Sequence, residues 1–234
     1  MNIEKLEEAY KHAQASGGDF TEHLKFNKLL LSDNSYEIID YHYDLLRRRE
    51  NMDFYYDIRA SFTRRPNIEQ FLLKKIKDEK DHNMLADILQ ILGTIKSSYA
   101  GKLAREFIQH EQESHREVAT FVLGWVGIEE DIPILTHHLL TEKNSKLRIT
   151  AASAHRQIHF RLPELKNKLL ASLKQGFEKE TDDEVIQWII VMIESIALKR
   201  LGLREDKQDP DIIHGDLEKA KLKTAKFLAE LDLG

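Results

Sequence analysis

Two histidines four residues apart are the pair in this sequence that comes closest to a metal site. His155 and His159 would lie on the same face of a helix, and imidazoles at this spacing can bind one zinc ion together. The segment is His-Arg-Gln-Ile-His, so it lacks the glutamate that follows the first histidine in zinc metalloproteases. We therefore expect one partly buried and one surface histidine, and no metal site.

The other residue types offer little for catalysis. His137 and His138 are adjacent, and neighbouring helical side chains point about 100° apart, so the two cannot easily bind one ion. The chain has no cysteine, which excludes disulfides, thiolate metal sites and a cysteine nucleophile. It also lacks a glycine-rich phosphate loop and a GxSxG motif. The sequence thus predicts no catalytic residue and no cofactor, and it favours a non-enzymatic role.

Two runs of arginine fall where predicted helices end: Arg47, Arg48 and Arg49, and then Arg64 and Arg65. Cations at these places interact favourably with the helix dipole and with the last carbonyl groups, which is a sufficient structural reason for them. The alternative is that they bind phosphate or an acidic partner. We keep both runs as a secondary binding-site prediction.

The two tryptophans are a further secondary candidate. Trp125 and Trp188 could form an aromatic platform on which a nucleic-acid base stacks. Trp125 lies between Gly124 and Val126 in a predicted repeat helix, and Trp188 lies in a strongly apolar helix. Packing in the core or in a groove is the simpler interpretation of both.

The composition indicates which elements must position these residues. The chain has 234 residues, of which only 10 are glycine and 4 proline. That scarcity favours long helices with short connections over an all-β fold. The N-terminus is polar and acidic, and no apolar run approaches the ~20 residues of a membrane span. We therefore expect a soluble, cytoplasmic protein with no membrane partner.

Four segments with the same apolar pattern recur along the chain, at 85–95, 116–126, 148–158 and 186–196. Their apolar residues recur at intervals of three, four and seven, which is typical of one helix face. A second amphipathic segment follows each of the first three, at 99–109, 130–141 and 162–177. Each repeat is thus predicted to be two antiparallel helices, and stacked pairs share a continuous core.

This pattern resembles the HEAT-repeat family, particularly the short bacterial HEAT-like repeats known from phycobilisome lyases. The resemblance rests on Arg116, Ala119, Leu123, Gly124 and Val126, and it covers about residues 80–200. It implies an all-α, right-handed α-solenoid of antiparallel helix pairs. His155 stands where the family usually has leucine, so the third repeat is expected to pack differently.

The flanking segments are predicted to be helical caps. Residues 1–79 form N-terminal helices that combine a cap with a degenerate first repeat, residues 80–200 the HEAT-like repeats, and residues 201–234 a loop and a capping helix. The N-terminal helices are predicted at about 2–15, 20–31, 35–50, 53–63 and 66–78. The polar loop covers 201–211, and the last helix runs from about 213 to 232.

The resemblance also implies a binding surface, because the second helices of HEAT arrays line the concave side. The aligned solvent-facing positions form a predicted concave ridge of Lys74, Lys75, Arg105, Glu106, His137, His138, Asn167 and Lys168. The ridge is mildly basic although the whole chain has a net charge of −5. A surface of one sign concentrates partners of the other sign, so we expect another protein with an acidic surface.

Two functional hypotheses follow. The first is a non-enzymatic protein-binding module that acts as an adaptor, an inhibitor or immunity-type protein, or an assembly factor. The second is a nucleic-acid-binding protein similar to the HEAT-like alkylpurine DNA glycosylases, which use aromatic residues beside a carboxylate. The acidic net charge favours the first. Salt dependence distinguishes them, because binding through several phosphates weakens steeply with added salt.

Overall fold

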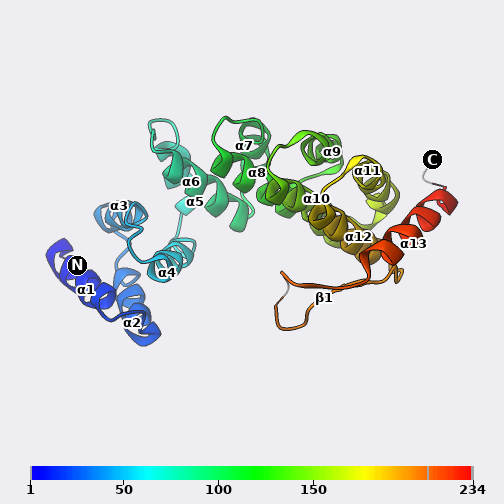
Figure 1. Ribbon diagram of the computed structural model, residues 1–234. Helices are drawn as coiled ribbons and strands as arrows, with labels where there is room; N and C mark the ends of the chain where they lie inside the picture. The colour runs from blue at the N-terminus through cyan, green and yellow to red at the C-terminus, as the bar shows by residue number, and fades with distance from the viewer. Residues whose placement is uncertain (1, 210, 233–234) are drawn as a thin grey trace. The chain divides into compact units, whose positions relative to one another are not determined.

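The computed structural model describes residues 2–209 and 211–232. These residues form thirteen α-helices, two short 3₁₀ helices and one two-stranded sheet (Figure 1). The all-α helical-repeat fold predicted from the sequence is confirmed. No helix in this part of the chain is long and apolar enough to cross a bilayer. The chain divides into an N-terminal unit, Met1–Ser97, and a C-terminal unit, Ser98–Gly234.

Six helices form the N-terminal unit: α1 (Ile3–Ala15), α2 (Phe20–Leu30), α3 (Tyr36–Leu45), α4 (Met52–Phe62), α5 (Ile68–Lys75) and α6 (His82–Thr94). Polar side chains fix where they begin, since Asp19, Asn51 and Asp81 accept backbone N–H groups at the starts of α2, α4 and α6. The predicted helix at 35–50 is too long. It ends at Leu45, because the following residues turn toward the Asn51 cap.

Aromatic rings fill the core of the N-terminal unit. Tyr10 of α1, Phe26 of α2 and Phe54 of α4 contact one another, with ring centroids between 5.3 and 5.8 Å apart. Phe62 and Phe71 form a second contact, at 6.1 Å. Edge-on and offset ring pairs of this kind stabilise a core beyond the burial of their area.

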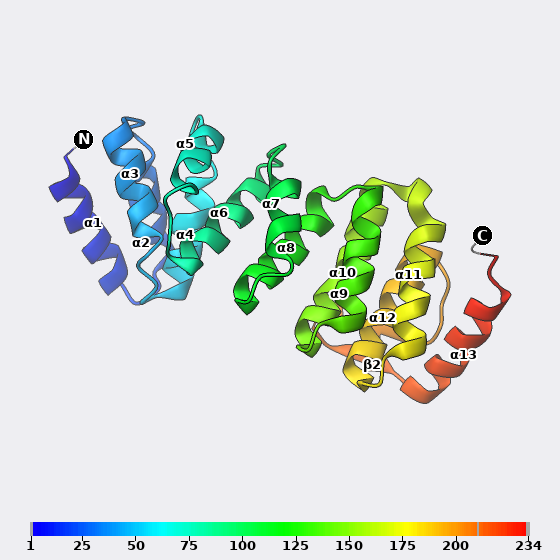
Figure 2. The same ribbon diagram turned by 90° about the horizontal axis from the view of Figure 1, so that it is seen from above.

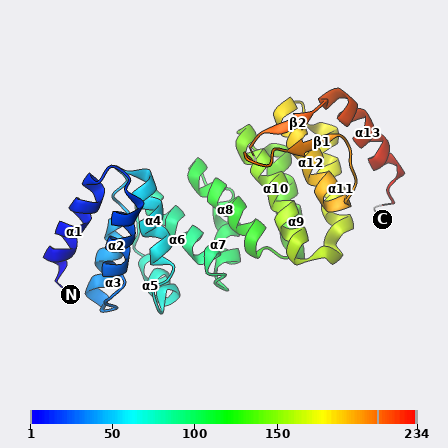
Figure 3. The ribbon, with the colours of Figure 1, turned by 90° about the horizontal axis from the view of Figure 1, so that it is seen from below.

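Seven helices and the sheet form the C-terminal unit. The helices are α7 (Ala100–Phe107), α8 (Glu113–Val126), α9 (Ile132–Thr141), α10 (Ser145–Arg161), α11 (Lys166–Lys179), α12 (Asp183–Ala197) and α13 (Leu217–Glu230). α8, α10 and α12 pack side by side in one layer, and α7, α9 and α11 pack on them (Figures 2 and 3). Single 3₁₀ turns, Glu129–Asp131 and Pro163–Leu165, precede α9 and α11.

Burial confirms the repeat register predicted from the sequence. The fourth and eighth residues of the four aligned segments all have an exposed fraction of 0%; they are Ile88, Leu92, Ala119, Leu123, Ala151, His155, Ile189 and Ile193. These positions recur on the inward face of α6, α8, α10 and α12. The intervals of the apolar pattern therefore locate the buried positions correctly within each unit, even at the position occupied by histidine.

The predicted loop at 201–211 contains a β-hairpin instead. Strand β1 (Leu203–Glu205) pairs antiparallel with β2 (Ile213–Gly215), and Leu203 lies opposite Gly215. Gly215 has φ +137°, and a Cβ there would lie 2.3 Å from the carbonyl oxygen of Gly202, so only glycine fits. Asp216 caps α13, which therefore begins four residues later than predicted.

Candidate functional site

A groove of about 570 Å³ lies between α9 and α11 of the C-terminal unit. Its walls are mostly aliphatic, and polar and charged side chains form its rim. It is lined by Glu129, Ile132, Pro133, Thr136, His137, Leu140, Lys168, Ala171, Ser172 and Gln175. Two residues of the predicted concave ridge, His137 and Lys168, are among them.

A chain of hydrogen bonds forms the floor of this groove. Nδ1 of His155 donates to the carbonyl of Ala151 (2.7 Å), so Nε2 accepts from the hydroxyl of Ser172 (2.5 Å). The Ser172 oxygen in turn lies 2.6 Å from the Thr136 hydroxyl. Burial lowers the pKa of His155 to about 4, so the ring is neutral at physiological pH. Histidine replaces leucine here because α11 presents a hydroxyl to it.

A second, smaller hollow adjoins the groove on the other side of α9. Its volume is about 230 Å³, and its lining includes Ile108, Gln109 and Ile134. Pro133 and His137 line both the hollow and the groove. The hollow and the groove therefore form one continuous surface, which extends from the end of α7 across α9 to α11.

The residues of the predicted concave ridge differ in exposure. Lys74, Arg105, Glu106, His137, Asn167 and Lys168 are exposed, Lys75 is half-buried and His138 is buried. The expectation that His138 faces solvent was therefore wrong. His138 lines the floor of the smaller hollow and is only 6% exposed. Its Nε2 lies 3.9 Å from the carboxylate of Glu142, and burial lowers its pKa.

Internal ion pairs engage most of the basic charge of the ridge. Arg105 donates two hydrogen bonds to the buried Asp131, at 2.6 and 2.9 Å. The other two pairs join Lys75 to Asp40 and Lys168 to Glu129. The Lys168 pair is largely exposed, at 61% and 49% of the two side chains. Exposed pairs contribute little stability and exchange partners readily, so Lys168 is available to a ligand in a way that Arg105 is not.

α11 is shifted along α9 relative to the predicted alignment. The alignment placed Lys168 level with His138, but Lys168 pairs with Glu129, and Ser172 lies beside Thr136. α11 has 14 residues and α9 has 10. With Ser172 beside Thr136, α11 therefore begins before α9 and ends after it.

Comparison with known proteins identifies the repeats. Residues 69–156, from α5 into α10, match the family model of HEAT repeats. Residues 69–156 therefore consist of HEAT repeats. No curated protein and no solved structure matches it significantly. The narrower resemblance to the bacterial phycobilisome-lyase type stays a prediction from the sequence.

Arginine–glutamate pairs fasten the HEAT helices together at equivalent places. Arg116 of α8 donates to Glu142 after α9 (2.7 and 3.1 Å), and Arg148 of α10 donates to Glu180 after α11 (2.7 and 3.2 Å). Each arginine also donates to two carbonyls of the turn before its own helix. Both glutamates accept backbone N–H groups from the next turn. The glutamate partners follow 26 and 32 residues after the arginines, a spacing too variable for the sequence to reveal.

The Glu142 pair predicts a pH dependence of stability. Burial alone raises the pKa of Glu142, but hydrogen bonds from Arg116 and from the N–H of Asn144 outweigh it and hold the pKa at about 2. Because the pKa of Glu142 is lower in the folded protein than in the unfolded chain, its ionised form stabilises the fold. This contribution is fully present above about pH 4.5 and is lost as the pH falls toward 2. We expect Glu142→Gln to lower the free energy of unfolding by about 2–3 kcal/mol at pH 7 and by much less at pH 3.

Urea unfolding at pH 7, 5 and 3 measures this difference. Glu113→Gln is the matched control, because Glu113 is an exposed carboxylate at the start of α8 and should change the free energy of unfolding by less than about 0.5 kcal/mol. A deficit of Glu142→Gln that stays constant from pH 7 to pH 3 would contradict the ionised pair.

The first arginine run is held within the N-terminal unit. Its guanidinium groups all have carboxylate partners: Arg47 pairs with Glu79 (2.7 Å), Arg48 with Glu7 (2.9 Å) and Arg49 with Asp87 (2.6 Å). All three also lie over tyrosine rings. These contacts give the three arginines a structural role. Binding of phosphate or of an acidic partner by this run stays a prediction.

The second run contains one surface and one core arginine. Arg64 is exposed, whereas Arg65 is only 3% exposed. Arg65 donates to the carbonyl of Leu30 (2.7 Å), the last residue of α2, and to that of Asp33 (2.5 Å), which follows the helix. Arg65 thus donates to a carbonyl at the end of a helix, as predicted. That helix is α2, however, and not α4, which Arg65 follows in the chain.

The aromatic and histidine candidates are packed against neighbours. Trp125 is half-buried and stacks on Phe121 with ring centroids 6.2 Å apart, and Trp188 is half-buried in α12. Of the histidine pair, His155 is fully buried and His159 half-buried. Both are therefore less exposed than predicted.

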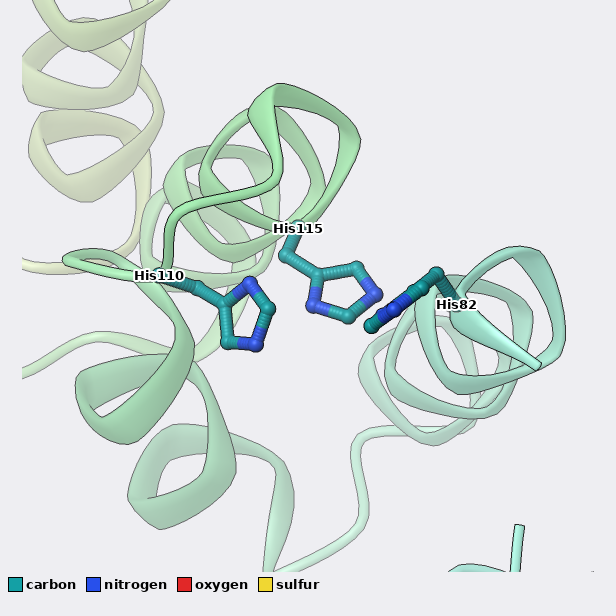
Figure 4. A group of neighbouring side chains, drawn as sticks. All are labelled: His82, His110 and His115. Carbon is teal, nitrogen blue, oxygen red and sulfur yellow. The ribbon is translucent and has the colours of Figure 1, made fainter. Parts of the chain in front are cut away.

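A pair of histidines that the sequence analysis did not select closes the turn between α7 and α8 (Figure 4). The rings of His110 and His115 lie 4.2 Å apart, and the His115 ring stacks on Phe107 at 4.9 Å. Nδ1 of His110 accepts the N–H of Gln112.

Proposed function

We propose that this HEAT-repeat protein is a non-enzymatic protein-binding module whose C-terminal unit holds a segment of its partner in the groove between α9 and α11. The observation that carries the proposal is the continuous surface formed by the groove and its neighbouring hollow, of about 570 and 230 Å³, which share Pro133 and His137. An open, elongated depression of this kind suits a peptide or a helix face. HEAT repeats commonly mediate protein interactions, which agrees with an adaptor, an inhibitor or an assembly factor in the bacterial cytoplasm.

The lining suggests the chemistry of the partner segment. Ile132, Leu140 and Ala171 offer an apolar wall for an aliphatic or aromatic side chain. Lys168 lies at one end of the groove in an exposed ion pair that a partner carboxylate can replace. His137 adds a polar group to the exposed rim. We therefore propose a segment with an apolar anchor followed by an acidic residue.

The test blocks the groove without touching the core. Gln175→Trp would place a large ring in the groove from its exposed edge, and Gln157→Trp makes the same change at an exposed position of α10 outside it. Lys168→Glu and Lys143→Glu form a second pair, one in the groove and one on the exposed surface elsewhere. The wild-type and variant proteins are used to capture partners from their native cells after nuclease treatment.

We expect one dominant protein to be recovered with the wild type and with both control variants, and at least about tenfold less of it with Gln175→Trp and Lys168→Glu. Equal recovery with all variants would contradict the groove. Loss of every partner on nuclease treatment would instead favour the nucleic-acid hypothesis.

A further inference from the structure

The β-hairpin lies on the side of α10 and α12 that faces away from α9 and α11 (Figures 1 and 3). Together with residues at the end of α12, it lines another hollow of the C-terminal unit. Its volume is about 560 Å³. It is lined by Glu194, Arg200, Gly202, Leu203, Arg204, His214 and Gly215. Because it lies in another layer than the groove, what it binds is independent of the proposed function.

The carboxylates around this hollow are already satisfied within the unit. Glu205 accepts from Arg156 at 2.9 and 3.0 Å. Asp206 accepts from His214 at 2.8 Å and from two backbone N–H groups. Oε1 of Glu194 accepts the N–H groups of residues 201–203, which holds the chain where it enters β1. Arg156 therefore offsets the charge of Glu205, and internal donors occupy oxygens of Glu194 and Asp206.

The arginines of the hollow are not compensated in this way. Arg200 and Arg204 are both exposed, and within residues 2–209 and 211–232 neither guanidinium has an ion pair or a side-chain hydrogen bond. A third cation lies at the edge, because Nζ of Lys223 would be 3.8 Å from a Cβ at Gly202. The hollow consequently has an excess of positive charge in a chain whose net charge is −5.

The backbone of the hairpin leaves room for a ligand between these cations. Gly202 and Gly215 both have positive φ, +122° and +137°, and neither carries a side chain that would fill the hollow. Guanidinium groups donate in a planar fork that matches the oxygens of a phosphate or carboxylate. A hollow of a few hundred Å³ is the size at which proteins bind small molecules, and it is larger than a single ion requires.

We propose that this hollow binds a small phosphorylated molecule, whose phosphoryl oxygens accept hydrogen bonds from Arg200 and Arg204 while the rest of the molecule lies against the hairpin. The acidic net charge of the chain opposes a long polyanion, which favours a small ligand over a nucleic-acid strand.

Calorimetric titration of the full chain with inorganic pyrophosphate at constant ionic strength tests this site. We expect saturable 1:1 binding that weakens at least about tenfold in Arg200→Gln and in Arg204→Gln, since each removes charge-assisted hydrogen bonds. Arg64→Gln is the matched control, an exposed arginine of the other unit, and Gln175→Trp should bind pyrophosphate like the wild type. Far-UV circular dichroism checks that each variant keeps its helices.

Two results would overturn the proposal. One is a binding heat that does not saturate as pyrophosphate is added, or an affinity for pyrophosphate that is the same in Arg200→Gln, Arg204→Gln and Arg64→Gln. The other comes from a parallel titration with a single-stranded 20-nucleotide DNA. If that strand binds about a hundredfold more tightly than pyrophosphate, with an affinity that depends on Arg200 and Arg204 and falls steeply with salt, the site is one for nucleic acid and not for a small ligand.

Discussion

Leu123→Asp is expected to unfold the C-terminal unit. The Leu123 side chain has an exposed fraction of 0% and lies in α8, on the inward face of the repeat. A carboxylate there would be surrounded by apolar groups with no cation beside it, at a cost of more than about 5 kcal/mol. That is comparable to the whole stability of a typical domain, about 5–15 kcal/mol, so no folded population should remain.

Tryptophan fluorescence measures this effect in one unit alone, because Trp125 and Trp188 both lie in the C-terminal unit. We expect the tryptophan emission of Leu123→Asp to be red-shifted relative to the wild type already in the absence of urea. Added urea should then produce no cooperative unfolding transition. Phe121→Asp places the same charge at a position of α8 that is 38% exposed, and it should leave a cooperative transition. A well-folded Leu123→Asp protein would show that the repeat register is wrong.

Arg65→Ala is expected to lower the free energy of unfolding of the N-terminal unit by about 3 kcal/mol. The guanidinium of Arg65 donates to the carbonyls of Leu30 and Asp33 and to the side chain of Asn34. It also donates to Nδ1 of His42. Removing it leaves two buried acceptors, this nitrogen and the carbonyl of Leu30, without their donor, and each unsatisfied group costs about 1–3 kcal/mol. Urea unfolding followed by circular dichroism gives the total, and hydrogen exchange of the segment 20–31 locates the loss at the end of α2.

Its neighbour supplies the control. Arg64 is exposed, so Arg64→Ala should change the free energy of unfolding by less than about 0.5 kcal/mol. If the two alanine variants were equally stable, the buried network around Arg65 would not exist.

The sequence predicted the helices and the core well, because both depend on local periodicity. Positions such as Ala119 and Ile193 follow from the intervals of the apolar pattern, and the fourth and eighth positions of all four aligned segments are buried. Helix starts also follow from the sequence, since Asp81 and Asp182 accept the first N–H groups of α6 and α12 with their own side chains.

Features that depend on contacts between distant residues could not be predicted in this way. The hairpin at 203–215 is held to α10 by Arg156, which lies 49 residues before its partner Glu205. The shift of α11 along α9 follows from a difference in helix length, which an alignment anchored at helix starts cannot reveal. The candidate groove was therefore found only in part, through His137 and Lys168.

Photo-crosslinking from within the groove tests the proposed function most directly. A photoreactive phenylalanine analogue replaces Gln175, which lines the groove, or Gln157, which is exposed on α10 outside it, and the native cells are irradiated. We predict that position 175 crosslinks to one protein, through a segment with an apolar residue and a nearby carboxylate, and that position 157 does not. Crosslinks to that protein from 157 but not from 175, or adducts to nucleic acid alone, would contradict the groove as the binding site.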